Sequence, residues 1–115
     1  MPAKQMLIGL SFTNSYGAHS GAWRWPGVDP AGWINIDHMV RYAQMAERGK
    51  FQFLFMPDFQ SMNADIGTAS SHVTMEPMLT LAAVARGTER IGMVATGSTT
   101  FTEPFNLARQ FKTLM

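Results

Sequence analysis

Three short apolar runs alternate with three segments of helical character, and this order constrains the fold more than any other feature of the chain. Strands that alternate with helices are joined by crossover connections, which make the strands parallel. We therefore predict an α/β fold built from three consecutive β-α units. The apolar runs span residues 6–12, 51–57 and 91–96, and the helical segments span residues 34–48, 76–86 and 104–115.

The first helical segment has a one-sided apolar pattern and signals at both ends. Asn35 or Asp37 would cap its first turn, because a side-chain oxygen there accepts a backbone N–H that has no partner within the helix. Gly49 suits the left-handed conformation that often follows a last helical turn. The apolar residues that recur on one face at helical spacing are Ile36, Met39, Val40, Ala43 and Ala46.

Glu-Pro dipeptides begin both the second and the third helical segments. Proline suits the first helical position because its missing N–H would have no partner there. The second segment is apolar almost all round, so we expect it to be largely buried. The third segment has an apolar stripe on one face, formed by Phe105, Ala108, Phe111 and Met115.

Polar residues follow each predicted strand. In parallel α/β proteins the carboxyl ends of the strands lie along one edge, where ligands bind. The segment after residue 12, Asp58 and the hydroxyl cluster of residues 96–100 should therefore share one rim. Taken alone, Asp58 is also a common turn residue and Thr96 an ordinary β-branched strand residue. Spacing by itself predicts only a site for a small molecule or cofactor.

The composition argues against several classes of function. A net charge of +1, with 15% charged residues, provides no basic stripe for nucleic acid. No stretch approaches the roughly 20 apolar residues of a membrane span. The chain has no cysteine, which excludes disulfides and zinc-thiolate sites and fits a reducing cytoplasm. Its three histidines, at positions 19, 38 and 72, show no spacing typical of metal ligands, so we predict no metal site.

The length of 115 residues suffices for one domain. A complete (β/α)8 barrel needs about 250 residues, and three β-α units alone leave open sheet edges. We therefore expect residues 1–115 to be the N-terminal part of a single barrel domain that continues in a longer protein.

Several separate segments occur together in the order expected of one family. They are HSGAWRWP (residues 19–26), ERGKFQFLFMPD (residues 47–58), the Glu76-Pro77 dipeptide and IGMVATGSTTFTEPFNLARQF (residues 91–111). With these segments the chain resembles the flavin-dependent monooxygenases of the luciferase-like superfamily. It is most similar to the group of nitrilotriacetate, dibenzothiophene-sulfone and long-chain alkane monooxygenases.

The resemblance implies a TIM-type barrel that binds reduced FMN and uses O2 to insert one oxygen atom into a small organic substrate. It also implies a two-component system, in which a separate NAD(P)H:flavin oxidoreductase supplies FMNH2, and a homo-oligomer. Residues that bind the FMN phosphate would lie beyond this chain, so we expect residues 1–115 alone to be inactive. The alternatives are an F420-dependent oxidoreductase of the same superfamily and a non-catalytic scaffold. The resemblance identifies neither the substrate nor a catalytic residue.

Two residues match flavin-contacting positions of the family. Asp58 matches an acidic residue at the end of the second strand, and Thr96 matches a residue at the end of the third. By similarity to bacterial luciferase, the Ala95–Thr96 peptide bond is expected to be cis. That enzyme has two histidines where this chain has Phe59 and Gln60, so no histidine acid/base role carries over.

The segment that contains His19, Trp23 and Arg24 has two interpretations. By resemblance it would line the substrate entrance, with the arginine available to an anionic substrate. The alternative, which we favour, is aromatic packing beneath a long loop with a solvated arginine.

Overall fold

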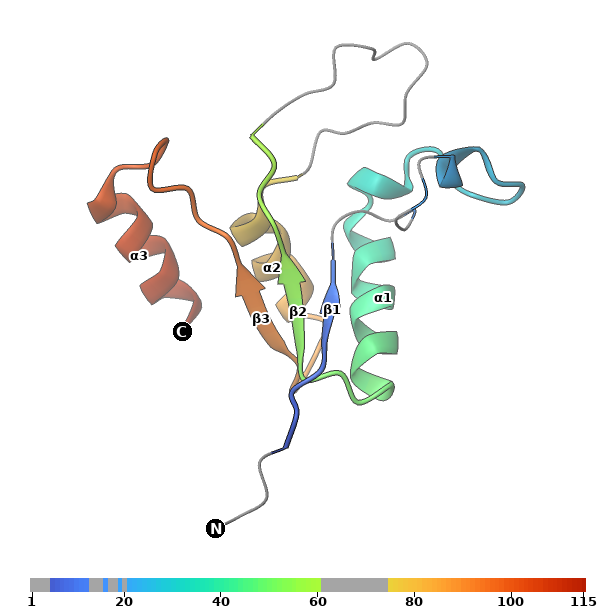
Figure 1. Ribbon diagram of the computed structural model, residues 1–115, viewed down its shortest axis with the longest axis horizontal. Coiled ribbons are helices and arrows are strands. Elements are labelled where there is room, and N and C mark those ends of the chain that lie inside the picture. The colour runs from blue at the N-terminus through green and yellow to red at the C-terminus, as the bar shows by residue number, and fades with distance from the viewer. Residues whose placement is uncertain (1–4, 13–15, 17–18, 20, 61–74) are drawn as a thin grey trace.

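The computed structural model describes residues 5–12, 16, 19, 21–60 and 75–115. Its strands form a parallel sheet in the order β1-β2-β3, as the sequence predicts (Figure 1). Each strand is shorter than the apolar run that contains it. The strands are β1 (Gly9–Ser11), β2 (Phe53–Met56) and β3 (Gly92–Ala95), and the α-helices are α1 (Ile36–Arg48), α2 (Pro77–Ala85) and α3 (Pro104–Leu114).

The hydrophobic core lies between one face of the sheet and the helices α1 and α2. Side chains alternate between the two faces of a strand, so Leu54 and Met56 point to this core and are fully buried. On α1 the buried residues are Met39, Ala43 and Ala46, which confirms the predicted apolar face.

The opposite face of the sheet is open to solvent over the described part of the chain. Phe55 is 39% exposed and its register partner Val94 is 42% exposed. Parallel sheets in α/β proteins are covered on both faces, or closed into a barrel whose interior is filled by side chains. These two side chains therefore occupy positions that belong to the interior of such a barrel.

At the ends of α1 the predicted Asn35 cap is confirmed, whereas the predicted first residue and the predicted left-handed glycine are wrong. Asn35 caps the helix, since its side-chain oxygen accepts a hydrogen bond from the His38 N–H at 3.2 Å. The helix begins at Ile36 because Gly32–Ile34 form a separate 3₁₀ turn, η2. Gly49 has a φ of −73°, and Lys50 instead adopts the left-handed φ of 65°. The positive φ thus falls one residue later than predicted.

Helix α2 begins at Pro77, as predicted, and is capped by the preceding glutamate. The Glu76 carboxylate accepts the Leu79 N–H at 2.6 Å. Pro77, Met78, Thr80, Leu81 and Val84 are buried. The prediction that this helix is largely buried is therefore confirmed, with Leu79, which is 73% exposed, as an exception.

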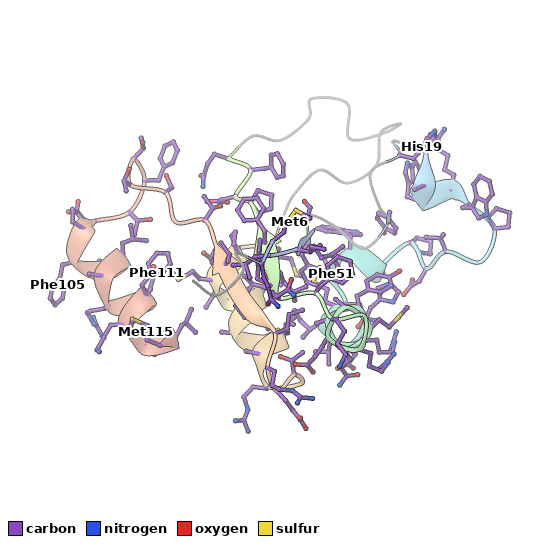
Figure 2. The ribbon with its side chains drawn as sticks, turned by 60° about the horizontal axis from the view of Figure 1, so that its bottom comes forward. Met6, His19, Phe51, Phe105, Phe111 and Met115 are labelled. Carbon is purple, nitrogen blue, oxygen red and sulfur yellow. The ribbon has the colours of Figure 1, made fainter. Side chains whose placement is uncertain are left out.

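Helix α3 begins at Pro104 as predicted, but none of its residues is buried. Figure 1 shows α3 standing apart from the helices that pack on the sheet. In Figure 2, Phe105 points away from the sheet, while Phe111 lies on the side of α3 that faces it. Of the predicted apolar stripe, Phe111 thus faces the sheet, whereas Phe105 does not and is 73% exposed.

The carboxylate of Glu47, at the end of α1, forms hydrogen bonds with the segment before β3. Its Oε1 accepts hydrogen bonds from the backbone N–H groups of Arg90 at 2.5 Å, Ile91 at 2.9 Å and Glu89 at 3.1 Å. These bonds, those from Arg90 and Ile91 foremost, lower the pKa of Glu47. The contact lies at the amino ends of the strands, opposite the predicted site.

Candidate functional site

The two predicted flavin-contacting residues follow neighbouring strands at the same end of the sheet. Met56 pairs with Ala95 in the parallel register, and the Thr96 N–H donates to the Met56 carbonyl at 3.1 Å. Asp58 lies two residues beyond Met56. The topology therefore brings Asp58 and Thr96 to one rim at the carboxyl ends of β2 and β3 (Figure 1).

A groove of about 1010 Å³ extends from this rim between α2 and α3. Asp58, Gln60 and Ser98 line its rim end, whereas Thr96 is half-buried and is not part of the wall. Asp58 and Thr96 thus share one end of the sheet, and of the two only Asp58 lines the groove. The other lining residues are Phe59, Glu76, Met78, Leu79, Ala82, Gly97, Phe101, Thr102, Glu103, Asn106, Leu107, Arg109, Gln110, Thr113 and Leu114.

Gly97 fixes the distance between the rim and α3. A Cβ atom at this position would lie 2.7 Å from Leu107 Cδ1 and 3.0 Å from Phe111 Cε2, which is too close for carbon atoms. The glycine therefore lets α3 approach the end of β3 and form one wall of the groove. The sequence placed Gly97 in a polar loop, but its contact with α3 depends on how the helix packs.

The Asp58 carboxylate has a defined partner at the rim. The side-chain amide of Gln60 donates a hydrogen bond to Asp58 Oδ2. Between them in the chain, Phe59 is exposed, as is Phe101 on the loop after β3. In that loop, Ser98 Oγ accepts the Phe101 N–H at 3.4 Å. Gln60 occupies one of the two positions at which bacterial luciferase has a histidine. The sequence alone had assigned no role to this glutamine.

The groups at this rim suit the polar edge of a flavin ring. A carboxylate such as that of Asp58 can accept hydrogen bonds from ring N–H groups, and hydroxyls such as those of Thr96 and Ser98 can either donate or accept. A phosphate needs cationic or backbone N–H donors, and Arg109 is the cation that lines the groove. Its guanidinium lies 5.8 Å from the centroid of the Phe105 ring. The described residues therefore fit the ring of FMN better than its phosphate.

The segment around η1 (Ala22–Arg24) lies at the β1 side of the molecule, away from the groove. Figure 2 shows His19 on the far side of the sheet from α3. The Arg24 guanidinium stacks over the Trp23 ring with 4.5 Å to its centroid, and Arg24 is exposed. His19 Nδ1 accepts the Gly21 N–H at 3.0 Å. These contacts hold Arg24 against Trp23, on the side of the molecule away from the groove.

His38 contacts neighbours on its own helix rather than the rim. His38 lies on α1, where its ring meets Tyr42 edge-on at 4.5 Å and its Nδ1 is 3.2 Å from an Arg41 guanidinium nitrogen. His72 lies outside the described residues. Within the described ranges, no three His, Asp or Glu side chains come together in a way that would hold a metal ion.

The Ala95–Thr96 peptide bond corrects one expectation. It is trans, as are the other described peptide bonds. A cis bond before a residue other than proline costs about 3 kcal/mol and persists only where surrounding structure imposes it.

The fold and the rim define a class of protein: the first three β-α units of a (β/α)8 barrel, with a polar site at the carboxyl ends of the strands. The sequence profile of the luciferase-like monooxygenase family matches residues 6–115. The chain belongs to this family, which confirms the resemblance inferred from its sequence.

Curated relatives align with almost the whole length of this chain. N-acetyl-S-(2-succino)cysteine monooxygenase of Bacillus subtilis (strain 168) is 39% identical over 112 residues, covering 96% of this chain and 25% of the relative. Nitrilotriacetate monooxygenase component A of Aminobacter aminovorans is 37% identical over 122 residues, covering 96% and 27%. The chain thus spans about a quarter of the length of these relatives.

Solved structures confirm the barrel fold. EDTA monooxygenase from Chelativorans sp. BNC1 superposes with a TM-score of 0.86 at 24% identity, covering 96% of this chain and 26% of that one. A riboflavin lyase solved with modified FMN and riboflavin superposes with a TM-score of 0.80 at 25% identity, covering 96% and 27%. Among the described helices, none is long and apolar enough to cross a membrane.

Proposed function

We propose that the protein containing this chain is a monooxygenase that uses FMNH2 and O2 to insert one oxygen atom into a small organic substrate. The observation that supports this most strongly is the family match over residues 6–115, together with a polar rim at the strand ends. Relatives at 37% and 39% identity are monooxygenases by name. The F420 alternative has no comparable support.

In this proposal Asp58 and Thr96 orient the flavin ring. The Asp58 carboxylate accepts a flavin N–H, and the Thr96 hydroxyl bonds an oxygen or nitrogen on the polar edge of the ring. Reduced FMN, when bound, supplies the electrons for oxygen chemistry, which belongs to the cofactor rather than to side chains. The exposed rings of Phe59 and Phe101 would keep water from that edge once a substrate covers them.

The proposal extends to a partner and an assembly. Nitrilotriacetate monooxygenase component A is named as one component of a system, which supports a separate NAD(P)H:flavin oxidoreductase as the source of FMNH2. We further propose a cytoplasmic homo-oligomer. Residues 1–115 alone should not turn over, because they hold a quarter of the length of the relatives and little that suits the FMN phosphate.

The names of three similar proteins suggest which substrates to test first. Nitrilotriacetate, EDTA and N-acetyl-S-(2-succino)cysteine each carry more than one carboxylate. A polycarboxylate is therefore the first class to test. A sulfone and a long-chain alkane, named in more distant relatives, serve as comparison substrates.

The experiment uses the purified full-length protein, a flavin reductase, NADH and FMN under ¹⁸O2. We expect one labelled oxygen atom in the product, and no product when the reductase, FMN or O2 is omitted. Residues 1–115 expressed alone should give no product under the same conditions. Absence of FMNH2 binding by the full-length protein in an anaerobic titration would contradict the proposal.

A further inference from the structure

We infer that Gln60 is a positioning residue that holds the Asp58 carboxylate in the orientation that binds flavin. This inference rests on the proposed function, since it concerns how that site is prepared for its cofactor. Its basis is the hydrogen bond from the Gln60 side-chain amide to Asp58 Oδ2, and the place of both residues on the wall of the same groove.

Because of this hydrogen bond, the two carboxylate oxygens of Asp58 have different roles. Asp58 follows Pro57 beyond the end of β2, where no strand pairing restricts its side chain. With Oδ2 held by Gln60, rotation of the carboxylate is restricted and Oδ1 remains available to accept a hydrogen bond from a ligand. A side chain that is already restricted before binding loses less conformational entropy when the ligand binds.

The chemistry of glutamine fits this role. Its amide donates without adding charge, so the Asp58 carboxylate keeps its negative charge for a flavin N–H. A carboxylate at position 60 would repel Asp58 instead. The charged groups that line the groove beside this pair are Glu76, whose carboxylate accepts the Leu79 N–H, Glu103 and Arg109.

The first test compares FMN binding by full-length wild-type protein and the Gln60→Leu variant, by fluorescence quenching for oxidised FMN and anaerobic titration for FMNH2. We expect Gln60→Leu to weaken both affinities about 5- to 10-fold, which is within the range for losing one typical intramolecular hydrogen bond. The Gln5→Leu variant changes an exposed glutamine before β1, at the opposite end of the sheet from the groove, and is the matched control that should bind FMN like wild type. Neither variant should change the unfolding temperature.

Gln60→Glu tests the electrostatic part of the inference. It should bind FMN more weakly than Gln60→Leu at neutral pH. It should recover affinity as the pH falls, because one proton shared by two adjacent carboxylates removes their repulsion. A pH profile parallel to that of the wild type would overturn the inference.

A double-mutant cycle shows whether Gln60 acts through Asp58. In an Asp58→Asn background, Gln60→Leu should no longer change FMN affinity, because the carboxylate that it positions is gone. An unchanged effect of Gln60→Leu in that background would overturn the inference while leaving the proposed function intact. If wild-type protein itself binds no FMN, the proposed function fails and the inference fails with it.

Discussion

The carboxylate of Glu47 accepts a hydrogen bond from the backbone N–H of Ile91, 2.9 Å away, and so joins the end of α1 to the start of β3. The two residues are 44 positions apart in the chain. Because the same carboxylate also binds the N–H groups of Arg90 and Glu89, three backbone donors at the amino ends of the strands depend on a single side chain.

We predict that Glu47→Gln destabilises the full-length protein and lowers its unfolding temperature by a few degrees. The amide keeps one oxygen but loses the negative charge that strengthens bonds to backbone N–H groups. Differential scanning calorimetry is the measurement. Glu89→Gln, which changes a nearby exposed glutamate, is the control and should leave the unfolding temperature unchanged.

The same contact predicts a pH dependence. The folded-state pKa of Glu47 lies below its ordinary value of 4.5, so the stabilisation is fully present above that pH. It is lost as the pH falls through the lowered folded-state value. The difference in unfolding free energy between wild type and Glu47→Gln should therefore be constant near neutral pH and shrink in acid. A difference that grows on acidification would contradict the contact.

Gly97→Ala should displace α3 and destabilise the protein by about 1–3 kcal/mol, because the new methyl group meets Leu107 and Phe111. Chemical denaturation measures the loss, and hydrogen exchange should increase in α3 more than in α1. Gly49→Ala is the matched control. Its added Cβ has no neighbour closer than 3.4 Å, and its φ is negative.

Lys50→Gly should stabilise the protein by about 0.5–1 kcal/mol, because glycine adopts a φ of 65° without the clash that a Cβ causes. Urea denaturation of the full-length protein is the measurement. Lys50→Ala separates this effect from the loss of the charge, since alanine removes the amine and keeps the Cβ. Equal stability of the glycine and alanine variants would show that backbone strain at position 50 is negligible.

Asn35→Ala should cost about 1 kcal/mol, because the His38 N–H loses its capping acceptor. Asn35→Asp should restore most of the stability, since its carboxylate also accepts that N–H and interacts favourably with the helix start. Thermal unfolding followed by circular dichroism compares the three proteins. If the aspartate variant is as unstable as the alanine variant, capping is not what Asn35 contributes.

The sequence alone was enough to predict the element order, the parallel sheet and the place of the rim. These features follow from local patterns: apolar runs, helical spacing, Glu-Pro helix starts and the Asn35 cap. Side-chain periodicity is set by backbone geometry, so neighbouring residues reveal it without knowledge of the fold. The family resemblance likewise depended on segments of sequence read in order, and the profile match over residues 6–115 confirmed it.

Tertiary packing decided what those patterns left open. The positive φ fell on Lys50 rather than Gly49, Leu79 stayed exposed on an apolar helix, and Gly97 became the contact point for α3. The hydrogen bond between the Glu47 carboxylate and the Ile91 N–H joins residues that are distant in sequence, and no local sequence pattern predicts it. Such contacts depend on where whole elements come to lie, because a side chain 44 residues away exerts no influence until the chain has folded around it.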